Sequence, residues 1–131
     1  MNDAELQGGE TFSLNPQFVR VTVKGGILTA RLVGPSVGQR EAPIITEEVG
    51  AVMKRYGRAI RYVIVDLSDV TMLSSMGLGM CIDLRNRAVK LKAPAILYGL
   101  QPDIAQLFKM MRIERLYKVA KNRDDLARLV A

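Results

Sequence analysis

The chain contains no histidine, no tryptophan and only one cysteine among its 131 residues. Without histidine it lacks the side chain that most often serves as a general base or as a metal ligand. The single Cys81 cannot form an intrachain disulfide or a zinc site by itself, and it fits a reducing compartment. These absences argue against an enzyme and against a disulfide-stapled secreted protein.

Long apolar runs are also missing. No run approaches the roughly 20 residues that a membrane-spanning helix requires, and the first residues, MNDAELQGGETF, are polar and acidic, unlike a signal peptide. The sequence therefore predicts a cytoplasmic protein. From the length we expect one domain over residues 12–131, preceded by a flexible tail over residues 1–11.

The net charge of +6 is confined to the C-terminal part of the chain. Residues 1–80 carry 8 basic and 8 acidic side chains, whereas residues 81–131 carry 11 and 5. The basic residues are scattered singly, with almost no aromatic residues among them to stack on bases. A solvated face, or a face that meets an acidic protein, is therefore favoured over direct nucleic-acid binding, which would show an affinity falling steeply with salt.

The hydrophobic pattern predicts a hairpin followed by alternating helices and strands. Residues 18–24 alternate apolar and polar side chains, Gly25 and Gly26 supply a turn, and residues 27–33 return. After Pro43, apolar residues recur at helical spacing as far as Tyr56. The later elements are a buried strand at 60–67, a helix at 78–90, a strand at 94–100, a helix from 101, a short strand at 117–120 and a last helix capped by Asn122.

This order of elements predicts a small α/β domain. We expect a mixed sheet of about five strands, with an N-terminal hairpin and then parallel strands, covered by about four helices. The residues expected to face inward on two of the helices are Leu78, Cys81, Ile82 and Val89, and Ile104, Leu107, Phe108 and Met111.

The segment LSSMGLG, residues 73–79, stands where a buried strand leads into a helix. We interpret Ser75 as the N-cap of that helix, a contact worth about 1 kcal/mol. Gly77 and Gly79 each lower helix propensity by about 1 kcal/mol, so their absent Cβ atoms must favour the close approach of another backbone, from this chain or from a partner.

This segment matches none of the common catalytic or phosphate-binding motifs. No lysine follows Gly79 as in a P-loop, and the third glycine of a dinucleotide fingerprint is missing. Ser74 and Ser75 have no nearby base to activate them, and Asp66 and Asp69 are interpreted as turn and cap residues. A serine at a helix N-terminus is nevertheless a good position for a phosphate, because free N–H groups and the helix dipole favour negative charge.

From residue 63 onward the sequence resembles the STAS family, the domain of anti-sigma-factor antagonists and of the cytoplasmic end of sulphate transporters. The motifs that carry the resemblance are VIVDLS at 63–68, LSSMGLG at 73–79 at the start of a helix, and Gln101-Pro102 before an amphipathic helix. The hairpin and first helix agree with the family's N-terminal half, so the resemblance extends from Phe12 to the C-terminus.

The resemblance implies a regulatory switch. In such antagonists, an anti-sigma factor that is itself a serine kinase of the GHKL type phosphorylates a loop serine, and the unphosphorylated form binds that kinase and releases a sigma factor. Carried over, this serine is Ser75. The implied partner-binding residues are Asp66, Ser68, Asp69, Ser74, Ser75, Met76, Gly77 and Leu78. The nucleotide belongs to the partner, so no cofactor and no membrane contact are expected, and the domain is expected to be a monomer or weak dimer.

Two positions depart from the family pattern. Ser74 replaces the usual aspartate, which makes it a competing phosphate acceptor, and Met76 replaces a small residue beside the site. Members without such a kinase partner serve as adaptors in larger signalling or transport assemblies, and this alternative stays open.

Overall fold

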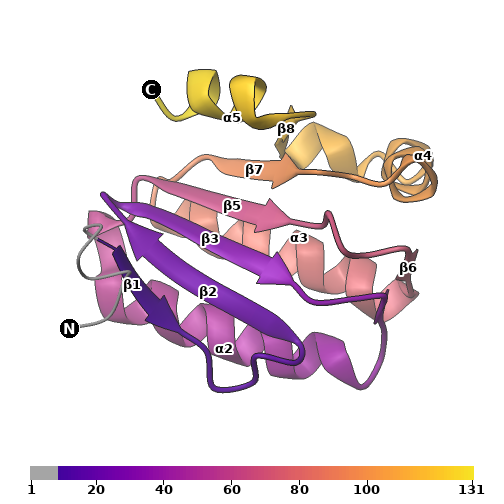
Figure 1. Ribbon diagram of the computed structural model, residues 1–131, viewed down its shortest axis with the longest axis horizontal. Coiled ribbons are helices and arrows are strands. Elements are labelled where there is room, and N and C mark those ends of the chain that lie inside the picture. The colour runs from indigo at the N-terminus through magenta and orange to yellow at the C-terminus, as the bar shows by residue number, and fades with distance from the viewer. Residues whose placement is uncertain (1–8) are drawn as a thin grey trace.

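The computed structural model describes residues 9–131, which form a six-stranded mixed sheet with helices packed against it (Figure 1). In spatial order the strands are β1 (Gly9–Phe12), β2 (Val19–Lys24), β3 (Ile27–Leu32), β5 (Tyr62–Asp66), β7 (Ala95–Tyr98) and β8 (Lys118–Ala120). The first three are antiparallel, and β3, β5, β7 and β8 are parallel. The predicted α/β fold with its hairpin and parallel strands is confirmed.

The edge strand β1 was not expected from the sequence. The tail that we expected at residues 1–11 lies outside the described residues except for 9–11, which belong to β1 and pair with β2. The four-residue strand GETF contains a single large apolar residue, Phe12, so it shows no alternation long enough to identify it.

Residues 9–131 contain four α-helices and two short 3₁₀ turns. These are α2 (Glu41–Tyr56), α3 (Ser75–Lys90), α4 (Pro102–Met110) and α5 (Arg123–Leu129), with 3₁₀ turns at Gly57–Ala59 and Ile113–Leu116. Helices α2 and α3 lie side by side against one face of the sheet, and α5 lies near β8 (Figure 1). Within the described part of the chain, no helix is both long and apolar enough to cross a bilayer.

The main core lies between the sheet and the helices α2 and α3. The alternation in β2 places Val19, Val21 and Val23 in this core and leaves Arg20 and Lys24 exposed. A smaller apolar cluster on the opposite face is formed by Ile64, Ile96 and Ala120, with Leu126, Leu129 and Val130 of the C-terminal segment packed against them.

Two residues expected to face inward are exposed instead. Val89 is 50% exposed, because the inner stripe of α3 follows Cys81, Leu84 and Ala88, and residue 89 lies about 100° around the helix from residue 88. Met111 is 57% exposed, because α4 ends at Met110 and the chain leaves the helix there. Both expectations were therefore wrong.

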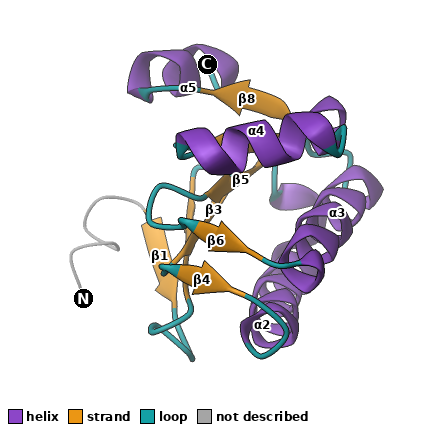
Figure 2. Cartoon of the chain, turned by 90° about the vertical axis from the view of Figure 1, so that its right-hand side faces the viewer, coloured by secondary structure: helices purple, strands orange, loops and turns teal. Residues whose placement is uncertain are grey.

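A second, two-stranded sheet positions the start of α3. Strand β4 (Ser36–Val37) pairs in parallel with β6 (Met72–Leu73), beside the ends of α2 and α3 (Figure 2). Strands of two residues carry no periodic signal, so the sequence did not predict them. They bring the loop after β5 next to the connection between β3 and α2.

Glu48 is the one charged side chain that is buried among the described residues, at 5% exposure. Its carboxylate accepts hydrogen bonds from the backbone N–H groups of Leu14 and Asn15, the latter at 3.2 Å, and from Asn15 Nδ2 at 3.3 Å. The connection between β1 and β2 is thereby tied to α2. A buried carboxylate is tolerated here because donors surround it.

Substituting Glu48→Ala is expected to lower the free energy of unfolding by about 1–3 kcal/mol, because it leaves the partly buried N–H groups of Leu14 and Asn15 without their acceptor. The matched control is Glu47→Ala, an exposed neighbour on the same helix, expected to change stability by less than about 0.5 kcal/mol. Urea denaturation of both variants checks this, and equal stabilities would show that the Glu48 contacts contribute nothing net.

Candidate functional site

The first turn of α3 is capped by Ser74 and not by Ser75. The backbone of Ser74 is extended (φ −81°, ψ 176°), and its Oγ accepts a hydrogen bond from the Gly77 N–H at 3.3 Å. The Ser74 N–H in turn donates to the carbonyl oxygen of Val37 in β4, at 3.0 Å. This bond keeps Ser74 extended, so the helix begins one residue later. The assignment of Ser75 as the N-cap was wrong.

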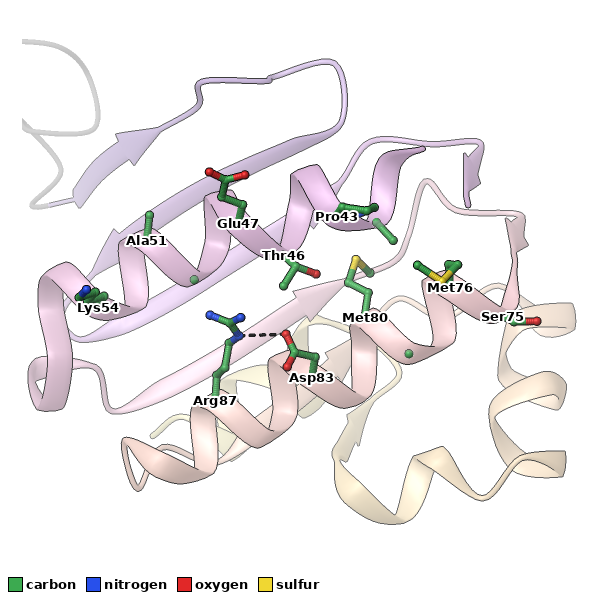
Figure 3. Close-up of a pocket in the computed structure, with 13 residues that line it drawn as sticks. Pro43, Thr46, Glu47, Ala51, Lys54, Ser75, Met76, Met80, Asp83 and Arg87 are labelled. Carbon is green, nitrogen blue, oxygen red and sulfur yellow. Dashed lines mark hydrogen bonds and ion pairs between the residues drawn. The ribbon is translucent and has the colours of Figure 1, made fainter. Parts of the chain in front are cut away.

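Ser75 is therefore the first residue of α3, and its side chain is exposed. Within residues 9–131 its hydroxyl makes no hydrogen bond, whereas the hydroxyl of Ser74 is already used in the cap. Figure 3 shows Ser75 at one end of a groove, with Met76 beside it. The two adjacent serines thus differ: the Ser74 hydroxyl oxygen accepts a backbone hydrogen bond, and the Ser75 hydroxyl oxygen accepts none within the described residues.

The two glycines of the segment occupy different surroundings. A Cβ at Gly77 would lie 2.7 Å from the Val37 carbonyl oxygen and 2.6 Å from Leu73 Cδ1, so the close approach of this chain's own backbone explains that glycine. A Cβ at Gly79 would meet nothing within 4 Å. Packing within the described residues therefore does not require glycine at position 79.

The carboxylates near the loop are engaged in local contacts. Asp66 Oδ1 accepts from the N–H and the Oγ of Ser68, at 2.9 and 2.6 Å, which closes a turn after β5. Asp69 pairs with Arg31 at 2.9 Å, and Gln101 Nε2 donates to the Ser68 carbonyl at 2.7 Å. These contacts agree with the interpretation of Asp66 as a turn residue and fix the shape of the loop that precedes Ser74.

A groove of about 670 Å³ runs between α2 and α3 and begins at Ser75 (Figure 3). Of the residues predicted to bind a partner, Ser75 and Met76 line it, while Gly77 is buried and Leu78 is half-buried. Met72 in β6 and Met76 are 66% and 49% exposed, as a contact surface requires. The groove is lined by Ala42, Pro43, Thr46, Glu47, Gly50, Ala51, Lys54, Ser75, Met76, Gly79, Met80, Asp83 and Arg87.

Sequence reasoning missed the contribution of α2 to this groove. Pro43, Thr46, Gly50 and Ala51 are small or short side chains on one face of α2, and they leave the space open. The sequence did contain a pattern that could have predicted this face, because Pro43, Thr46 and Gly50 recur at the 3–4 residue spacing of one side of a helix. It was missed because only large apolar residues were used to identify helix faces.

Two ionisable groups near α3 are buried in the core and do not line the groove. Burial raises the pKa of the Cys81 thiol to about 12, so it stays protonated at neutral pH. Burial, together with the proximity of Cys81, also raises the pKa of Tyr117, whose hydroxyl donates to the Cys81 carbonyl at 2.5 Å. Among the described residues, no three carboxylate or thiol side chains gather where they could hold a metal ion.

Comparison with known proteins identifies the family. The model of the STAS domain family matches residues 15–126, so the chain belongs to the STAS domain family. Among curated protein sequences no relative is detected.

Solved structures of several proteins share the fold. An anti-sigma factor antagonist from Mycobacterium paratuberculosis is 19% identical, with 93% of each chain covered and a TM-score of 0.69. SpoIIAA of Bacillus in its phosphorylated form is 14% identical, with 85% of this chain and 98% of that chain covered and a TM-score of 0.65. The murine Slc26a9 anion transporter is 14% identical over 95% of this chain but only 23% of its own, with a TM-score of 0.69.

The cap assignment can be tested by removing each hydroxyl in turn. Ser74→Ala is expected to lower the free energy of unfolding by about 1 kcal/mol, because the Gly77 N–H loses its acceptor. Ser75→Ala removes no hydrogen bond and is expected to change it by less than about 0.5 kcal/mol. Denaturant unfolding measures both, and the reverse order of effects would restore Ser75 as the cap.

The two glycines give opposite predictions. Gly77→Ala is expected to destabilise the protein by about 1–3 kcal/mol, because the new Cβ forces the Val37 carbonyl or the helix to shift. Gly79→Ala is expected to stabilise it by about 0.5–1 kcal/mol, since alanine favours the helix and meets no neighbour. Thermal denaturation distinguishes them, and a destabilising Gly79→Ala would contradict the open surroundings of Gly79.

Proposed function

We propose that the protein is an anti-sigma-factor antagonist that binds an anti-sigma factor through the start of α3 and is released by phosphorylation of Ser75. The observation that carries the proposal is the exposed Ser75 hydroxyl, free of hydrogen bonds within residues 9–131 at the first position of the helix. The competing acceptor Ser74 already caps the helix through Gly77.

The position suits a charge-driven switch. A phosphate on Ser75 adds a charge of about −1.5 to −2, and the free N–H groups of the first turn of α3 stabilise it in the unbound protein. In a complex the same charge would have to be desolvated beside the exposed methionines Met72 and Met76. Phosphorylation therefore favours the free protein over the complex.

The fold likeness supports this proposal. SpoIIAA has been solved in a phosphorylated form, and the mycobacterial structure is that of an anti-sigma factor antagonist. By analogy the partner is a serine kinase of the GHKL type that brings its own nucleotide, so this chain acts by binding and not as an enzyme. We place this switch in the cytoplasm and expect the unbound domain to be a monomer or weak dimer.

The test is a pull-down from cells of the source organism with wild type, Ser75→Ala and Ser75→Asp, together with intact-mass analysis of the native protein. The expected result is one phosphate at Ser75, and a kinase-like anti-sigma factor retained by wild type and Ser75→Ala but bound at least about tenfold more weakly by Ser75→Asp. Gln106→Glu adds the same charge at an exposed position on α4 and serves as the control.

The contrary result is retention of the same partners by all forms, with no phosphate on the native protein. The chain would then be a non-switching STAS adaptor in a larger assembly, and Ser75 would have no regulatory role.

A further inference from the structure

The groove between α2 and α3 has the dimensions of a docking site for one helix. Its lining positions run from Pro43 to Lys54 on α2 and from Ser75 to Arg87 on α3. Both helices follow parallel strands of the sheet, so they run in the same direction and the groove continues along both. At a rise of about 1.5 Å per residue these spans are roughly 16 and 18 Å long, which matches a helix of about 11–12 residues.

Two glycines line the groove, and they have different neighbours. At Gly50 a Cβ would lie 2.5 Å from a guanidinium nitrogen of Arg87, so that glycine makes room for an arginine of this chain. At Gly79 the space is open, and the backbone conformation does not demand glycine. A glycine inside a helix costs about 1 kcal/mol relative to alanine. The open space at Gly79 is thus available to an atom from another molecule.

The two ends of the groove differ in character. Next to Ser75 it is apolar, with Met76 half exposed and Met80 extending toward Pro43 (Figure 3). At the other end a second hollow of about 390 Å³ is lined by Lys54, Arg87 and Lys90.

Among the described residues, the carboxylates along the groove leave two of these three cations, Lys54 and Lys90, without a partner. Asp83 pairs with Arg87 at 2.9 Å, and Glu47 lies on the rim of the first hollow. Within residues 9–131, Lys54 and Lys90 have no carboxylate partner. This end of the groove therefore carries positive charge that a negatively charged ligand could complement.

We propose that the groove binds an acidic amphipathic helix of a partner protein. Apolar residues at i, i+3, i+4 and i+7 of that helix pack over Gly79 and against Met76 and Met80, and its Asp or Glu side chains approach Lys54 and Lys90. That this partner is the anti-sigma factor rests on the proposed function. The two are connected because the groove begins at Ser75. The groove itself and its preference for an acidic helix do not depend on phosphorylation.

The experiment places a benzophenone amino acid at position 51 of the full chain, in place of exposed Ala51 on the groove rim, in cells of the source organism. The cross-linked partner peptide is then identified by mass spectrometry. We expect it to lie in an acidic amphipathic helix. Gly79→Leu, which fills the groove, is expected to lower the cross-link yield at least about tenfold. Ala127→Leu adds the same side chain to an exposed position on α5 and is expected to leave the yield unchanged.

Charge is tested by Lys54→Glu with Lys90→Glu, for which a loss of at least about tenfold is also expected. A melting temperature for Gly79→Leu no lower than that of wild type shows that its effect is not unfolding, since leucine favours the helix. The proposal is overturned if position 51 yields no more cross-link than exposed Asp124, if the captured peptide is basic or non-helical, or if Gly79→Leu binds like wild type.

These failures are distinguishable from failure of the proposed switch. If Ser75→Asp still cross-links to an acidic helix and no phosphate is found, the groove proposal stands and the switch does not. If phosphorylation of Ser75 controls partner release while Gly79→Leu has no effect, the switch stands and the groove proposal is wrong.

Discussion

The carbonyl oxygen of Val37 is the point on which the geometry of the site depends. It accepts a hydrogen bond from the Ser74 N–H at 3.0 Å. It also lies only 2.7 Å from the position that a Cβ at Gly77 would occupy. The first contact holds Ser74 extended, so that its side chain can cap the helix. The second requires glycine one turn into α3. One carbonyl group of the two-residue strand β4 thereby decides which serine caps the helix and which has a free hydroxyl.

The two glycines of the LSSMGLG segment stand close together in the sequence but need different explanations. Gly77 and Gly79 are separated by one residue, yet one faces this chain's own backbone and the other faces open space. The propensity cost of glycine in a helix is the same at both sites, about 1 kcal/mol. At Gly77 the contact with β4 offsets it, whereas at Gly79 nothing among the described residues does. Gly79 lines the groove, so a reason for glycine at this position would have to come from what the groove binds.

The sequence predicted the fold better than it predicted the site. Alternation in residues 18–33 and the apolar run at 60–67 were long enough to identify strands, and the order of elements then determined an α/β domain. The two-residue strands β4 and β6 were not predicted, because pairing between distant segments leaves no local pattern in the sequence. For the same reason Ser75 was taken for the cap, since the bond from Ser74 to Val37 joins residues 37 positions apart in the chain.

The groove was missed for a related reason, because the spacing of Thr46, Gly50 and Lys54 on α2 becomes meaningful only when α3 lies beside it. Neither helix alone defines a hollow. Met76 was expected to be exposed, and it is 49% exposed, whereas Pro43, which also lines the groove, was interpreted only as a helix-starting residue.

In the proposed complex the two ends of the groove act almost independently. Ser75 and Arg87 are separated by about 18 Å along α3, which exceeds the Debye length of about 8 Å at physiological ionic strength. A phosphate on Ser75 is therefore largely screened from Lys54, Arg87 and Lys90, and it does not simply neutralise them. Its effect falls on the apolar end near Met76, where a charge must lose its water before a partner can pack. Phosphorylation would then control whether the groove is occupied, while the distant lysines would select which helix occupies it.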